Sequence, residues 1–173
     1  MKQISILVLM IFIFTACANK NYPLETLNHQ YLNEKIKKLS FQIQSLSKNI
    51  DKKEANDIAF EAVNYSKYLA KEYNVTTSAL FHNFLININF KKRGLCYHYA
   101  NDLLKYLSEK NYKSFRLEKV VAKPGEYFEH NSLIITRDDI EFRNSIVLDA
   151  WRDTGDLYFS KVKDDRSYTW QLK

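Results

Sequence analysis

Residues 93–100 read RGLCYHYA, and this stretch indicates both where a helix begins and where a reactive group lies. Gly94 ends a basic turn. From Cys96 onward, apolar residues recur at helical spacing through Ala100, Leu103 and Leu107. Cys96 is therefore expected in the first turn of a helix. Unpaired backbone N–H groups and the helix dipole stabilise an anion there, so they favour a thiolate with a lowered pKa.

Helical periodicity precedes this stretch, and strand periodicity follows it. Asp51 and Glu54 form a capping-box pattern at the start of the second expected helix. The third carries Leu80, Phe84 and Ile88 as a stripe that is expected to face the core. Helices followed by antiparallel strands predict an α+β fold: N-terminal helices, then an antiparallel sheet. The expected helices cover residues 31–50, 51–74, 78–88 and a segment from residue 96, and the expected strands cover residues 115–122, 131–136, 145–151 and 157–162.

Composition limits what the chain can be. Its 173 residues are 46% hydrophobic and 14% aromatic, which is enough for one compact domain, expected over residues 31–173. Two cysteines are too few for a disulfide scaffold or a four-thiolate zinc site. No glycine-rich phosphate-binding motif is present, and neither a cofactor nor a metal is expected.

The amino terminus has the pattern of an export signal. Residues 1–17 read MKQISILVLMIFIFTAC, in which a cation precedes an apolar run, residues 4–14, that is too short to span a bilayer. The end of this segment, residues 14–17, resembles the bacterial lipobox. That resemblance implies a lipoprotein signal peptide over residues 1–16, a lipidated (palmitate-type) Cys17, and a tether over residues 17–30. An ordinary signal peptide and a short membrane anchor are the alternatives.

The lipobox reading predicts a compartment and a set of partners. Ala18, rather than Asp, after the lipidated cysteine favours the periplasmic face of the outer membrane in a bacterial cell envelope. Without residues 1–16 the net charge is 25 − 20 = +5, which favours anionic surfaces, and the absence of a basic run of five or more argues against nucleic acid. Cys96 is then left without an internal disulfide partner in an oxidising compartment.

His130 and Asp149 are expected to meet across a hairpin. Asp149 lies in the apolar sequence Ile146–Trp151, where a buried carboxylate needs a partner. A pairing in which residue numbers sum to about 279–281 places His130 opposite or diagonal to Asp149, within ~4.5–8 Å. A hydrogen bond between them would fix the imidazole tautomer and leave the other ring nitrogen to face a thiol.

The order Cys96, His130, Asp149 resembles that of the transglutaminase-like cysteine peptidase superfamily. The resemblance lies in residues 94–100, similar to a G-x-C-x-x-x-A helix start, in the His130 strand, and in residues 148–151, although Glu129 replaces an aromatic residue of the family pattern. It implies a papain/transglutaminase-like core with Cys96 as nucleophile, His130 as base and Asp149 as orienting residue. A peptidase, amidase or acyl-transfer activity on a peptide or protein substrate is implied as well.

Further residues around this catalytic triad have expected roles. Gly94 and Trp151 are expected to border a substrate cleft. The Cys96 N–H is a candidate oxyanion donor, together with a side chain from Asn87 or Asn89. His98 points about 200° around the helix from Cys96 and is expected to be solvent-facing or to lie behind the site.

Two other functions stay open. One is an inactive lipoprotein that keeps the fold for peptide binding or assembly. The other is a papain-like cell-wall amidase, against which Asp149 argues because such enzymes usually carry a histidine as the third member.

Overall fold

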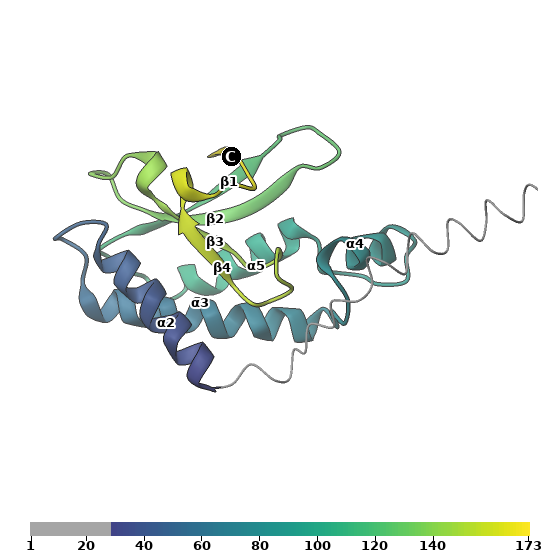
Figure 1. Ribbon diagram of the computed structural model, residues 1–173, viewed down its shortest axis with the longest axis horizontal. Coiled ribbons are helices and arrows are strands. Elements are labelled where there is room, and N and C mark those ends of the chain that lie inside the picture. Colours follow the sequence, from purple (N-terminus) through teal and green to yellow (C-terminus); the bar gives the residue numbers. More distant parts are fainter. Residues whose placement is uncertain (1–28) are drawn as a thin grey trace, which may run out of the picture.

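The computed structural model describes residues 29–173, which form an α+β fold as predicted (Figure 1). The signal peptide, Cys17 and almost all of the expected tether lie outside the described residues. Within residues 29–173 no helix is both long enough and apolar enough to cross a membrane. The helices are α2 (His29–Gln44), α3 (Lys52–Glu72), α4 (Ala79–Asn87) and α5 (Cys96–Ser108), and the strands are β1 (Arg116–Ala122), β2 (His130–Thr136), β3 (Ile146–Asp149), β4 (Tyr158–Lys161) and β5 (Trp170–Leu172).

The five strands form one antiparallel sheet in the order β4-β3-β2-β1-β5. Helix α5 lies along one face of it next to β2, and α3 packs against α5 on that side of the sheet (Figure 1). Alternate residues of β2 therefore pack into two hydrophobic clusters, one on each face of the sheet. Leu133 and Ile135 pack with the helices, while Ile134 joins a smaller cluster on the other face that includes Trp170. This makes β2 a central strand that is buried along its whole length.

Asp51 starts α3 as expected, but Glu54 does not complete a capping box. The Asp51 carboxylate accepts hydrogen bonds from the backbone N–H groups of Lys53 and Glu54, at 2.7 and 3.0 Å. The Glu54 carboxylate instead accepts from the backbone N–H groups of Lys113 and Ser114, each at 2.8 Å. Glu54 thus ties the connection between α5 and β1 to α3, a long-range contact that local spacing does not reveal.

Helix α4 corrects the expectation that its apolar stripe faces the core. Leu80, Phe84 and Ile88 are all exposed, whereas Ala79 and His82 are buried. The helix therefore packs by its less apolar side. A sequence stripe specifies that a helix has a distinct apolar face, but not which partner that face has.

Two other boundaries differ from expectation. Helix α2 ends at Gln44 rather than near residue 50, and Ile50 is buried from the turn that follows. Strand β5 was not expected at all, because it has only three residues and just one of them, Trp170, is buried. Its pairing with β1 is specified by tertiary contacts rather than by periodicity.

Candidate active site

Cys96 is the first residue of α5, as the sequence predicts. The turn before it is closed by His98, whose Nδ1 accepts hydrogen bonds from the backbone N–H groups of Gly94 and Leu95 at 3.2 and 3.1 Å. Burial lowers the pKa of His98, which keeps the ring neutral and able to accept. His98 is thus half-buried and caps the start of the helix that begins at Cys96.

Position 94 requires glycine for two reasons, its backbone conformation and the closeness of a neighbouring side chain. Its φ is +123°, and a Cβ there would lie 2.5 Å from Nε2 of His82. His82 is buried and donates from Nε2 to the carbonyl oxygen of Arg93 at 2.8 Å. The space in front of Gly94 is therefore filled by His82 from α4, not left open for a substrate.

Replacing Gly94 by alanine is expected to lower the free energy of unfolding by at least about 2 kcal/mol, because it adds steric overlap with His82 to an unfavourable φ. Gly125→Ala is the matched control, since its φ is +75° but no atom lies within 4 Å of the added Cβ. Urea denaturation followed by circular dichroism measures both. Equal losses in the two variants would show that His82 does not restrict residue 94.

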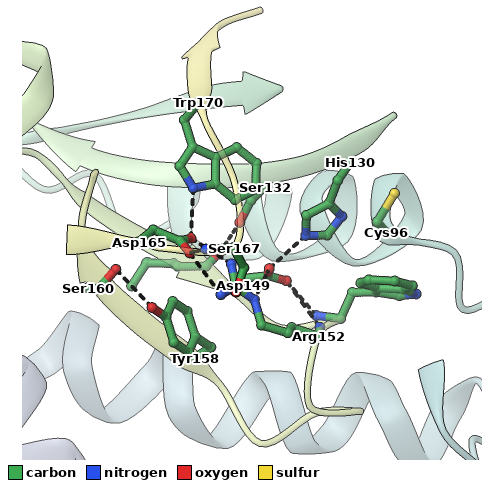
Figure 2. A network of polar contacts seen from close by, with 12 residues as sticks. Cys96, His130, Ser132, Asp149, Arg152, Tyr158, Ser160, Asp165, Ser167 and Trp170 are labelled. Atoms are coloured by element: carbon green, nitrogen blue, oxygen red, sulfur yellow. Dashed lines mark hydrogen bonds and ion pairs between the residues drawn. The ribbon is translucent and has the colours of Figure 1, made fainter. Parts of the chain in front are cut away.

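His130 and Asp149 form the expected pair. Strands β2 and β3 pair with residue numbers that sum to 281, which makes His130 diagonal to Asp149. His130 Nε2 donates to Asp149 Oδ2 at 2.6 Å, and the two residues are 2% and 1% exposed. Nδ1 of the same ring is buried and makes no hydrogen bond to any described residue. Figure 2 shows the ring between the Asp149 carboxylate and the Cys96 side chain.

A wider polar network holds the Asp149 carboxylate. Oδ1 accepts from the backbone N–H groups of Trp151 and Arg152, at 3.1 and 3.2 Å, and Oδ2 accepts from Arg152 Nε at 3.0 Å. The Arg152 guanidinium also makes a two-pronged contact with Asp165, at 3.1 and 2.6 Å (Figure 2). Sequence reasoning missed Arg152 and Asp165. The signal available for Arg152 was its spacing of three residues from a carboxylate that needs a partner.

Aromatic rings surround the His130 imidazole. The ring centroids of Trp151, Tyr168 and Trp170 lie 4.8, 4.4 and 5.2 Å from it. β3 ends at Asp149, so Trp151 lies in the following turn, where its Nε1 donates to Asn83 Oδ1 at 3.1 Å. These rings keep water from the His130–Asp149 pair and so strengthen its electrostatic attraction.

The Cys96 sulfur lies at the edge of this buried group. Its Sγ is 3.8 Å from the carbonyl oxygen of Glu129, and the residue is 9% exposed. A gap beside Cys96, with about 150 Å³ of empty volume, admits no water molecule. This gap is lined by Cys96, Tyr99, Ala100, Leu103, Asn131, Ser132, Leu148, Asp149, Ala150 and Trp151.

The electrostatics favour a thiolate–imidazolium pair. Burial raises the pKa of the Cys96 thiol, but His130 and the Asn131 amides together outweigh it and leave that pKa below its ordinary value. Burial likewise opposes a charged His130, yet Asp149 and then Cys96 raise its pKa to about 9. The Asp149 pKa is lowered because His130 and Arg152 outweigh its desolvation.

The two shifts affect stability in opposite directions as pH changes. The His130 pKa rises from 6.5 to about 9 on folding, so its stabilising contribution is complete below pH 6.5 and is lost as pH rises through 9. The Cys96 pKa falls on folding, so its contribution is complete above the ordinary thiol pKa and is lost as pH falls through the lowered value.

In the Cys96→Ala variant, we expect the pH dependence of the free energy of unfolding to show the contribution of His130 without that of the thiol. Its free energy of unfolding should decrease between pH 6.5 and 9, by at most about 1.4 kcal/mol per pH unit, because Asp149 still raises the His130 pKa. The wild-type profile should be flatter over this range, since thiolate formation in the folded state offsets the loss. Urea denaturation at a series of pH values measures both. Parallel profiles would contradict a coupled pair.

Several other expectations concern residues around the triad. The Glu129 carboxylate accepts from the backbone N–H of Gly125 at 2.9 Å and from Asn131 Nδ2 at 3.1 Å, which lowers its pKa to about 2. Glu129 therefore stabilises the turn between β1 and β2.

The two candidate oxyanion donors do not reach the thiol. Asn87 and Asn89 are exposed, and neither makes a described contact with Cys96. No group of side chains within residues 29–173 is arranged to bind a metal ion.

Comparison with known proteins gives no relative: no family model, no curated protein and no solved structure matches this chain. A thiol at a helix N-terminus, a buried imidazole with one nitrogen directed to that side, and a carboxylate on the other nitrogen are the parts that nucleophilic acyl transfer needs.

Proposed function

We propose that the chain is a lipid-anchored protein of the bacterial cell envelope, with a transglutaminase-like thiol hydrolase domain that acts on a peptide or protein substrate. One observation supports this above all. The 2.6 Å hydrogen bond from His130 Nε2 to Asp149 leaves Nδ1 unpartnered on the side of a cysteine at a helix N-terminus. The anchor and the outer-membrane location are supported by the sequence of residues 1–18.

In the proposed reaction the Cys96 thiolate attacks an amide carbonyl carbon and forms a carbon–sulfur bond. The negative oxygen that develops is stabilised by the Cys96 backbone N–H, which at the first position of α5 has no partner within the helix. His130 gives its Nδ1 proton to the leaving amine. The neutral ring then takes a proton from water, which attacks the thioester and releases the acid. An amine in place of water would give transfer instead.

An acyl-enzyme experiment tests this function without knowledge of the substrate. Full-length protein is treated with p-nitrophenyl acetate, and p-nitrophenol release is recorded while mass spectrometry follows the Cys96 peptide. The expected result is a burst of one equivalent with an acetyl group on Cys96, followed by slower turnover. Cys96→Ser should show no burst, and His130→Gln should show neither burst nor turnover.

The narrow exposure of Cys96 favours a second candidate, the inactive peptide-binding or assembly lipoprotein. The same experiment separates the two. Absence of acetylation at Cys96 in a folded protein would exclude the hydrolase and leave binding as the function of this domain.

A further inference from the structure

The exposed apolar side chains of this protein are concentrated on one short helix and the turn after it. Of the 13 large hydrophobic side chains that are exposed within residues 29–173, six fall between residues 80 and 97. Five of these form a surface defined here as the α4 face. It consists of Leu80, Phe81, Phe84, Ile88 and Phe90.

Helix α4 turns its more apolar side to solvent. Leu80, Phe84 and Ile88 recur every four residues on that side. The opposite side makes the protein contacts through polar residues: His82 reaches Arg93, and Asn83 accepts from Trp151. An outward apolar stripe on a helix that carries no charged residue marks an interaction surface.

The charge around the α4 face indicates what covers it. The 29 residues from 73 to 101 contain no acidic residue and three basic ones, Lys91, Lys92 and Arg93. Arg93 pairs with Asp102, whereas Lys91 and Lys92, beside Phe90, form no ion pair within residues 29–173; Lys91 Nζ donates to the carbonyl oxygen of Asn74 at 3.0 Å. Apolar side chains bordered by lysines match the interface of a bilayer with anionic headgroups.

We propose that the α4 face docks onto the surface of an anionic phospholipid bilayer, with its apolar side chains inserted below the headgroups and Lys91 and Lys92 among the phosphates. The inference rests on the proposed envelope location, which places a bilayer within reach, and not on the thiol chemistry. In the proposed mature chain the lipid on Cys17 precedes α2 by only 12 residues, so a second anchor lies in the same bilayer. Docking would hold the helix that adjoins Gly94 against the membrane.

Fluorescence of an introduced tryptophan tests the docking. Phe84→Trp is placed in the full-length chain, with Phe41→Trp as the matched control, since Phe41 is also exposed and lies on α2 toward the other end of the molecule (Figure 1). The native Trp151 and Trp170 are buried and give the same background in both. Each variant is reconstituted into vesicles of phosphatidylglycerol and phosphatidylethanolamine with brominated acyl chains, or into phosphatidylcholine vesicles with the same chains.

The expected result is a blue shift and about twofold quenching of the added emission of Phe84→Trp in anionic vesicles, with less in phosphatidylcholine and little for Phe41→Trp in either. Phe81→Trp, on the same face, should behave like Phe84→Trp and serves if the first variant misfolds. Equal quenching of Phe84→Trp and Phe41→Trp would overturn the proposal.

Other occupants of the α4 face would give other results, each of which overturns the proposal. A blue shift that grows with protein concentration but without quenching would indicate a second copy of the chain. A blue shift independent of both concentration and vesicles would indicate coverage by residues of the chain itself. Cys96→Ser in the Phe84→Trp background should leave the quenching unchanged, so a failure of the thiol chemistry is distinguished from a failure of docking.

Discussion

At pH 6, iodoacetamide is expected to alkylate Cys96 of the wild-type chain about a hundredfold faster than Cys96 of the His130→Gln variant. In the wild type the imidazolium of His130, whose pKa is raised to about 9, lowers the pKa of the Cys96 thiol and so increases the fraction of the sulfur that is thiolate. Without the imidazolium, burial raises the thiol pKa, and well under about 1% of the sulfur would be ionised at pH 6. Mass spectrometry of the Cys96 peptide gives the rate separately from that of Cys17.

His98→Gln is the matched control for this experiment. His98 lies two residues from Cys96, but its ring accepts backbone hydrogen bonds at the helix start and does not contact the thiol. Glutamine at the same position of a helix also accepts such bonds, so the alkylation rate should stay within about threefold of the wild type. Circular dichroism must show that both variants are folded. Similar rates for the wild type and His130→Gln would contradict an activated thiolate.

Replacing Asp149 by alanine is expected to reduce the free energy of unfolding at pH 7 by about 3–5 kcal/mol. The carboxylate is 1% exposed and accepts from both His130 and Arg152. Its removal leaves a buried imidazole without its acceptor and a half-buried guanidinium with Asp165 alone. Urea denaturation measures the loss.

Two further substitutions separate charge from packing in this prediction. Asp149→Asn keeps an acceptor for the backbone N–H groups of Trp151 and Arg152, so it should lose less stability than Asp149→Ala, yet it should slow alkylation of Cys96 at pH 6 because the His130 pKa falls. Asp138→Ala removes a side chain that is 97% exposed and should change stability little. Equal effects of Asp138→Ala and Asp149→Ala would contradict the role of burial.

The sequence predicts the start of α5 at Cys96 and the His130–Asp149 pair because the signals for them are local or follow from one hairpin. A cysteine after a basic turn predicts the start of α5, and a carboxylate within an apolar strand requires a partner across the hairpin. The observed register, with a sum of 281, lies within the predicted range. The α+β class follows from the change of periodicity after residue 110.

The remaining parts of the site depend on contacts that periodicity does not contain. Tyr168 and Trp170 approach His130, and Asp165 approaches Arg152, because β5 pairs with β1, a partner about 50 residues earlier in the chain. The prediction that the apolar stripe of α4 faces the core was wrong for a related reason. A side-chain contact from His82 to the Gly94 turn orients that helix, and the apolar stripe is left exposed in the part of the chain that the structure describes, residues 29–173.

The position of β5 next to β1 also suggests an order of events during folding. Strands β2, β3 and β4 each pair with the strand before them, so these four strands can assemble without the last residues of the chain. Besides Trp151, the rings that enclose His130 belong to Tyr168 and Trp170, near the end of the chain. A chain folded only as far as β4 would leave this imidazole more open to water, so completing the edge of the sheet completes the enclosure of the histidine.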